Sequence, residues 1–163
     1  MSDDCGECGF LLDVSGSRHS GPAVTAGMRE VAEILLGGAE VRSRRAPTVW
    51  SPLEYACHLR DVTLIQRERV ILARRVDGAP ALNMGRDERA DFDGYIEQDP
   101  VDVARQLIDA TSMYVRVIER LGPADWDRTL LHGSVERPLG WTVAQAHHEV
   151  QHHLLDIRRQ LRT

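Results

Sequence analysis

The chain has 163 residues, 42% hydrophobic and 28% charged, a composition typical of one soluble domain with a hydrophobic core. Its formal net charge of -5 argues against nucleic acid or an anionic membrane as its main partner. No apolar run approaches the roughly 20 residues that span a bilayer. The acidic start MSDDCGECGF lacks a signal-peptide pattern, so the sequence predicts a cytoplasmic protein.

The N-terminal segment, predicted to span residues 1–20, contains the sequence CGEC from Cys5 to Cys8. With Cys57 the number of cysteines is odd, which argues against a disulfide framework and favours a reducing compartment. Two cysteines at CxxC spacing supply half of a zinc knuckle, but no second CxxC follows them. A metal-binding hook and a flexible tail both fit this pattern.

Four segments of the predicted bundle, residues 21–163, have helical character, and three of them open with start signals. The sequence SPLE, from Ser51, places a capping serine before a proline, with a glutamate where a capping box requires it. DPVD from Asp99 and TVAQ from Thr142 are similar start signals. The predicted helices span residues 23–36, 51–78, 99–121 and 142 onwards.

The two long connections, residues 77–98 and 124–140, show no convincing alternation of apolar and polar residues. Four helices without a sheet predict an all-α fold, a four-helix bundle with a long loop between the second and third helices. Long loops in compact domains often cover a site, which makes residues 77–98 a candidate cover.

The last predicted helix contains four of the chain's 7 histidines, in the sequence AQAHHEVQHHLLDI. Residues four apart lie on one face of an α-helix, and among these four only His148 and His152 have that spacing. Such a pair can bind one metal ion. His147 and His153 point elsewhere around the helix and are expected to be dispensable for metal binding, and Glu149 is expected to be exposed.

Two apolar stripes run along this helix. Trp141, Ala144 and Leu155 share the stripe of the histidine pair, which is therefore expected to face inward. A helix that is apolar on two faces is buried on both, so one face can pack in the bundle and the other against a neighbouring helix or a second subunit. The opposite stripe consists of Val143, Val150, Leu154, Ile157 and Leu161.

The second predicted helix supplies a further histidine, His58, in the sequence WSPLEYACHLRDV. Its stripe is mostly apolar, and a buried imidazole needs a hydrogen-bond partner or a metal. A satisfied core histidine is the alternative interpretation, but the HxxxH pair on another helix favours a ligand. Cys57 lies about 100° around the helix from His58 and is expected to be core packing.

The sequence WSPLEYACHLRDV, followed near the C-terminus by HEVQHHLLDI, resembles the DinB-like family of metal-binding four-helix bundles. The resemblance covers nearly the whole chain after Ala46. That family includes S-transferases and maleylpyruvate isomerases that use the thiols mycothiol or bacillithiol. Its usual metal ligands, one histidine on the second helix and an HxxxH pair on the last, fall on His58, His148 and His152.

Three imidazoles leave coordination positions open, as a catalytic site requires. Zinc is the expected metal, although nickel and iron also suit imidazole. A bound metal can lower the pKa of a thiol, which could then attack a carbon electrophile, the S-transferase reaction that the resemblance implies. Mycothiol is the expected thiol, because all 20 basic residues are arginine, a bias that suggests a GC-rich, actinobacterial genome.

Three further residues are candidates for the site. Asp61 and Asp156 each follow a candidate histidine by about one turn and could orient its ring or act as a general base. A solvated or salt-bridged carboxylate is the alternative, and for Asp156 the nearby Arg158 and Arg159 favour that alternative as strongly. Arg69 shares the stripe of His58 and could bind an anionic group of a substrate or extend to solvent.

The leading hypothesis is a metal-dependent enzyme that transfers a small thiol to an electrophile. A second hypothesis is a thiol-dependent isomerase or a metal-dependent hydrolase in the same fold. A third is a non-catalytic metal-binding stress protein. Open coordination positions favour an enzyme without identifying its substrate.

Overall fold

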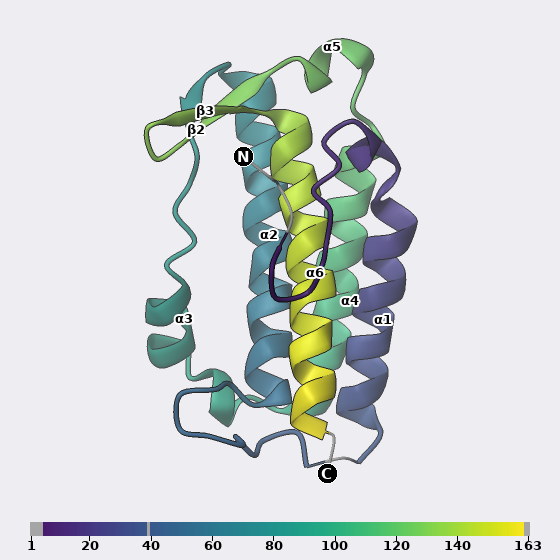
Figure 1. Cartoon of the computed structure of the whole chain (residues 1–163), viewed down its shortest axis with the longest axis vertical. Coiled ribbons are helices and arrows are strands. Elements are labelled where there is room, and N and C mark those ends of the chain that lie inside the picture. Colours follow the sequence, from purple (N-terminus) through teal and green to yellow (C-terminus); the bar gives the residue numbers. More distant parts are fainter. Residues whose placement is uncertain (1–4, 39, 162–163) are drawn as a thin grey trace.

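The computed structural model describes residues 5–38 and 40–161. Residues 1–4 of the predicted N-terminal segment and residues 162–163 of the predicted bundle lie outside the described residues. Within the described part, four long helices form the bundle (Figure 1). They are α1 (Gly21–Leu36), α2 (Pro52–Arg75), α4 (Pro100–Ile118) and α6 (Leu139–Leu161).

The long helices pack in the spatial order α1, α4, α2, α6, so that α6 contacts α2 on one side and α1 on the other. Figure 1 shows them side by side along the long axis, with the N-terminal segment crossing in front of α6. The described part also contains four shorter helices: η1 (Gly16–His19), α3 (Arg86–Phe92), η2 (Tyr95–Glu97) and α5 (Pro123–Trp126). The predicted four-helix bundle is confirmed.

Two of the predicted helix starts are confirmed by their capping contacts. The backbone N–H of Glu54 donates to Ser51 Oγ at 3.3 Å, and the backbone N–H of Ser51 donates to Glu54 Oε2 at 2.9 Å, which is the expected capping box. At the start of α4, Asp99 Oδ1 accepts from the backbone N–H of Val101 at 2.9 Å. These contacts satisfy N–H groups that a helix leaves unpaired at its start.

The predicted start of the last helix is wrong by one turn. The helix α6 begins at Leu139, so Thr142 lies inside it, fully buried, and its hydroxyl is 3.0 Å from His132 Nε2. Leu139 is itself fully buried, and its backbone N–H donates to the carbonyl of Arg128 at 2.8 Å. A tertiary contact therefore starts this helix ahead of the local capping sequence.

The absence of a sheet was also predicted wrongly. In the described residues a small sheet joins the two long connections: β1 (Ala79–Pro80) runs parallel to β2 (Thr129–His132), which pairs antiparallel with β3 (Val135–Pro138). These strands are too short to show an alternating pattern, and the pairing of β1 with β2 joins segments far apart in the sequence. Gly133 adopts a φ of 65° in the tight turn between β2 and β3.

The core of the bundle fixes how α6 is rotated about its own axis. Its buried stripe faces the other long helices and consists of Val143, Ala146, Val150, Leu154 and Ile157. Where α1 crosses α6, Gly27 allows a close approach, because a Cβ there would lie 2.6 Å from Val150 Cγ1. The stripe confirms one of the two predicted apolar faces, and it determines which residues face α2.

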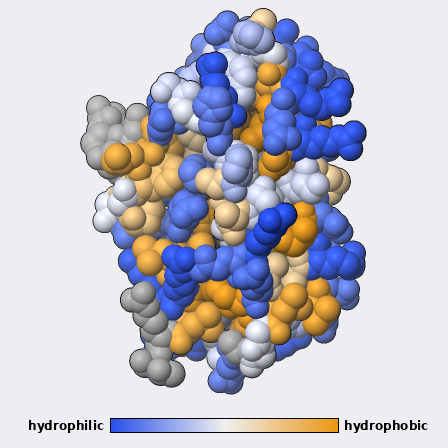
Figure 2. All heavy atoms as spheres, turned by 90° about the vertical axis from the view of Figure 1, so that its right-hand side faces the viewer, coloured by the Kyte–Doolittle hydropathy of each residue, from blue (hydrophilic) through white to orange (hydrophobic). Residues whose placement is uncertain are grey.

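The surface that carries α1 is mixed in polarity. Figure 2, turned to that side of the bundle, shows apolar residues in several patches separated by hydrophilic side chains. No helix within the described residues combines the length and apolar character needed to cross a membrane. The possibility that a second subunit packs against one face of α6 stays a prediction.

Candidate metal centre

A cleft of about 380 Å³ lies between α2 and α6. The loop after β1 contributes Met84 to its wall, α3 contributes Arg86 and β2 contributes His132, so the long connections help to enclose it. The remaining lining residues come from α2 and α6. They are His58, Val62, Ile65, Gln66 and Arg69 on α2, and Trp141, Gln145, His148, Glu149, His152 and His153 on α6.

One group of metal-binding side chains joins the two helices across this cleft. His58 Nε2 and His153 Nε2 each lie 3.3 Å from Glu149 Oε2, and the three potential ligand atoms lie within 4.8 Å of one another. His58 is 2% exposed, and its ring packs against Trp50, with the centroids 5.2 Å apart. We call His58, Glu149 and His153 the cleft group.

The charges of His58 and Glu149 suit metal ligands. Burial lowers the pKa of His58, which favours the neutral imidazole. Burial alone would favour a protonated Glu149, but hydrogen bonds with His153 and His58 hold the pKa of this carboxyl far below its ordinary value. A neutral imidazole and a carboxylate are the forms that bind metal ions.

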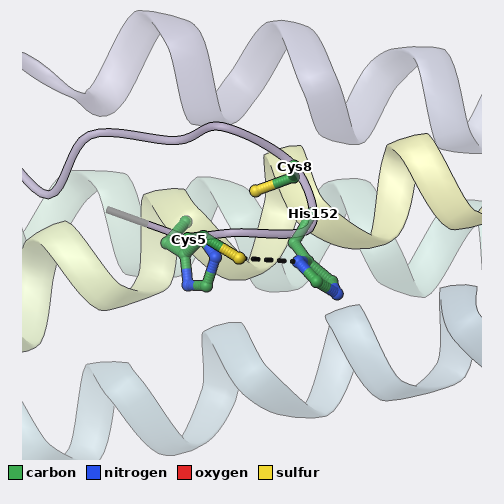
Figure 3. Close-up of side chains that lie close together, drawn as sticks. Cys5, Cys8 and His152 are labelled. Carbon is green, nitrogen blue, oxygen red and sulfur yellow. Dashed lines mark hydrogen bonds between the residues drawn. The ribbon is translucent and has the colours of Figure 1, made fainter. Parts of the chain in front are cut away.

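A second group of metal-binding side chains lies beside the first on α6. Cys5, Cys8, His148 and His152 place one potential ligand atom each within 4.8 Å of one another. Figure 3 shows the two cysteines of the N-terminal segment beside α6 with Cys5 directed towards His152, and Cys5 Sγ lies 3.5 Å from His152 Nδ1. We call these four residues the hook group. The flexible-tail interpretation of CGEC is not what the structure shows for residues 5–12, which pack against α6.

Asp156 contacts one histidine of each group. Its Oδ2 lies 3.1 Å from His153 Nδ1 and 3.5 Å from His152 Nε2. Both imidazoles therefore direct their other nitrogen towards the ligand atoms of their own group. Burial works in the opposite direction, but the hydrogen bonds with Asp156 and Glu149 raise the pKa of His153 above its ordinary value. A carboxylate that holds the second nitrogen of a ligand histidine is a common feature of metal sites.

The structure divides the predicted ligands His58, His148 and His152 between two groups. His148 and His152 do lie together, with ring centroids 5.3 Å apart, but His58 lies with Glu149 and His153. His153 points away from the His148 and His152 pair, as expected, but it lines the cleft, and the expectation that Glu149 is exposed is wrong because this side chain also lines the cleft. Counting residues from the buried stripe explains this result. Positions 149 and 153 flank that stripe on the side of α2, whereas positions 148 and 152 lie opposite it.

The other predicted site residues have mixed outcomes. Asp61 is buried away from the cleft. Tyr95 Oη donates to Asp61 Oδ2 at 2.7 Å, and Arg60 Nε donates to Asp61 Oδ1 at 2.8 Å. Asp61 is therefore a salt-bridged carboxylate, the alternative to a role beside the metal ligands. Arg69 lines the cleft, and its Nε donates to the carbonyl of Leu82 at 2.9 Å. Cys57 is fully buried, as expected, and burial raises the pKa of its thiol to about 12.

His147 lies outside both groups. Its ring packs edge-on against Phe10, with centroids 4.9 Å apart, and burial lowers its pKa. The prediction that it does not bind metal agrees with this position.

The sequence did contain a signal for Glu149 and His153. They form a second i, i+4 pair of metal-binding residue types, one place further along the helix than His148 and His152.

The fold and the cleft define a four-helix bundle with metal-binding side chains at the interface of two helices. A family model, the DinB superfamily, matches residues 24–157, and the chain belongs to this superfamily. Among solved structures, YfiT from Bacillus subtilis is similar at a TM-score of 0.65 and 16% identity, over 86% of this chain and 87% of YfiT. YfiT is described as a probable metal-dependent hydrolase with an unusual four-helix bundle topology. No curated protein matches the chain.

Proposed function

We propose that this chain is a metal-dependent enzyme that transfers a low-molecular-weight thiol to a small electrophile. The observation that carries the proposal is the cleft group, which offers three donors from two helices at the wall of a cleft. Three protein ligands leave coordination positions open, as in catalytic sites, whereas structural zinc sites have four. The description of YfiT as metal-dependent supports a metal in this fold.

The residues of the cleft group would hold the metal. The donor set of two imidazoles and one carboxylate suits zinc and also iron, and nickel is a further candidate because imidazole binds it well. When bound, such a metal lowers the pKa of a thiol or water at an open position, so that the nucleophile is available near neutral pH. Asp156 would fix the ring of His153 in its ligand orientation.

The lining of the cleft supports an external nucleophile. Among the described lining residues none is serine, threonine, cysteine or lysine, the side chains that most often form covalent intermediates. The attacking group would therefore enter with a co-substrate. The cleft volume of about 380 Å³ lies within the range of small-molecule sites.

Two arginines could anchor an anionic part of the thiol or the electrophile. Arg69 on α2 and Arg86 at the start of α3 both line the cleft. Hydrogen bonding to Leu82 holds the guanidinium of Arg69 in place, and Arg86 lies over the ring of Trp50 at 5.6 Å from its centroid. Guanidinium groups bind carboxylates and phosphates in two-pronged geometry. Mycothiol is the thiol we favour, because the family resemblance and the lysine-free composition point to it.

The experiment compares metal-loaded and metal-stripped protein with a panel of electrophiles, with mycothiol, with glutathione and without thiol. Conjugate formation, followed by mass spectrometry, should require both metal and thiol and should be faster with mycothiol. Glu149→Gln should lose at least about 100-fold in rate, because the conservative change removes the carboxylate ligand. Glu88→Gln, on the exposed side of α3, is the matched control.

Hydrolysis is the second candidate, because YfiT carries that description and the same three donors could serve water as a nucleophile. The two functions separate in the same assay. Metal-dependent product that forms equally well without thiol would identify a hydrolase. Absence of any metal-dependent product across the panel would contradict both and favour a binding protein.

A further inference from the structure

We propose that the hook group is a second metal site, a closed zinc site that holds the N-terminal segment against α6. It shares no residue with the cleft group, and it does not depend on the reaction proposed for the cleft. Its four ligands are Cys5, Cys8, His148 and His152.

The N-terminal turn presents both cysteines to α6. The backbone N–H of Cys5 donates to the carbonyl of Phe10 at 3.0 Å, and the backbone N–H of Gly9 donates to the carbonyl of Cys5 at 2.8 Å. These two bonds close the sequence CGECGF into a compact loop with Cys5 and Cys8 at its inner edge (Figure 3). Gly9 has a φ of 72°, a conformation that glycine adopts without strain.

The loop is seated on the histidine stripe itself. Phe10 packs against the rings of His147 and His148, with centroids 4.9 Å and 5.3 Å apart. Cys5 Sγ approaches His152 Nδ1 to 3.5 Å. The segment that carries Cys5 and Cys8 therefore packs over the face of α6 that presents both His148 and His152.

Two cysteines and two histidines form one of the closed ligand sets of structural zinc. The spacings CxxC and HxxxH fall within those of such sites, although here the two halves come from segments far apart in the chain. No position is left open for a substrate in a tetrahedral site with four protein ligands. The hook group thus differs in kind from the cleft group, which has three.

The surroundings of the histidines also point to a ligand. Glu7 Oε2 at 3.4 Å and Asp156 Oδ2 at 3.5 Å flank His152 Nε2, so the proton belongs on that nitrogen and the lone pair of Nδ1 faces the sulfur of Cys5. An imidazole lone pair directed at a cysteine sulfur is the arrangement in which both side chains can bind one zinc ion.

The hook metal would also shape the cleft. His148 and His152 line the cleft as well as belonging to the hook group, so fixing their rings fixes part of the cleft wall. They would act there as positioning residues. Release of the hook would leave the cleft group intact and loosen one wall of the space that receives the substrate.

The test measures metal content and cobalt spectra of the whole chain in reducing buffer. Wild type should bind about two metal ions, and cobalt in the hook group should give a thiolate-to-metal charge-transfer band. Cys5→Ser with Cys8→Ser should lose that band and about half of the metal. Glu149→Gln should lose metal but keep the band. Cys57→Ala, which changes the buried cysteine, is the matched control and should keep both.

Hydrogen exchange gives an independent measurement. The amides of residues 5–12 should exchange at least about tenfold faster in the double cysteine variant or after metal removal, while those of α2 and α4 stay protected. A wild-type protein that binds metal without a thiolate band would overturn the proposal, as would a double variant with unchanged metal content. A wild-type protein that binds a single metal ion and shows the thiolate band would instead contradict the metal proposed for the cleft group and support the one in the hook group.

Discussion

His58 on α2 and Glu149 on α6 meet across the helix interface, with His58 Nε2 3.3 Å from Glu149 Oε2. The pair links two helices that also pack through core side chains. His153 adds a second imidazole to the same carboxylate oxygen at 3.3 Å. Without a metal, the carboxylate of Glu149 is the shared hydrogen-bond partner of both imidazoles, so loss of any one side chain would leave another without its partner.

Asp156→Asn should weaken metal binding in both groups. The carboxylate contacts His153 Nδ1 and His152 Nε2, and loss of such a contact typically costs about 10- to 100-fold in metal affinity. Competition with a chromophoric chelator would measure the change for each metal. Asp109→Asn, an exposed carboxylate on α4, is the matched control. Unchanged affinities in the Asp156 variant would show that the two histidines need no orienting partner.

His147→Gln and His153→Gln should behave differently. His147 lies outside both groups, so its variant should keep its metal content, whereas the His153 variant should lose the cleft metal. Elemental analysis of the two purified proteins measures this, and circular dichroism checks that both remain helical. Loss of metal from the His147 variant alone would mean that the rotation of α6 described above is incorrect.

Glu54→Gln should destabilise the fold by about 1–3 kcal/mol, because it removes the negative charge from a buried contact with Arg44 and from the acceptor of the Ser51 backbone N–H. Burial opposes ionisation, but the contacts with Arg44 and Ser51 lower the pKa of Glu54. The carboxylate therefore contributes stability above its ordinary pKa, and this contribution is lost as pH falls through the lowered value. Urea unfolding of both proteins at neutral and strongly acidic pH should show a difference that shrinks in acid.

Gly27→Ala should destabilise the bundle by about 1–3 kcal/mol, because the new Cβ would lie 2.6 Å from Val150 Cγ1. Adding Val150→Ala should recover part of that loss, since it removes the clashing methyl group. A double-mutant cycle of thermal unfolding measures the coupling. Additive effects of the two changes would show that α1 and α6 separate freely at this crossing.

The long helices could be predicted because their starts are encoded locally. Ser51 and Asp99 cap their helices through side chains a few residues from their targets. The start of α6 could not be predicted in this way, because the contact of Leu139 with Arg128 overrides the signal at Thr142. The sheet was missed because β1 gains its partner only when the two long connections meet.

The metal-binding helix was predicted, but not which of its residues face α2. The i, i+4 rule selects pairs on one face and is silent on how the helix is rotated in the bundle. That rotation follows from the packing of Val150 and its stripe, and it places Glu149 rather than His148 opposite His58. The role of Cys5 and Cys8 could not be predicted either, because their partners lie on the last helix.

The contact between Cys5 and His152 spans 147 residues of sequence. During synthesis the CGEC turn leaves the ribosome long before α6 exists, so its thiols remain without their histidines until α6 has been made. Closing so long a loop is slow compared with forming neighbouring helix pairs. The hook should therefore be the last element to form in folding, and the contact between Cys5 and α6 should be the first to open when a chelator removes the metal.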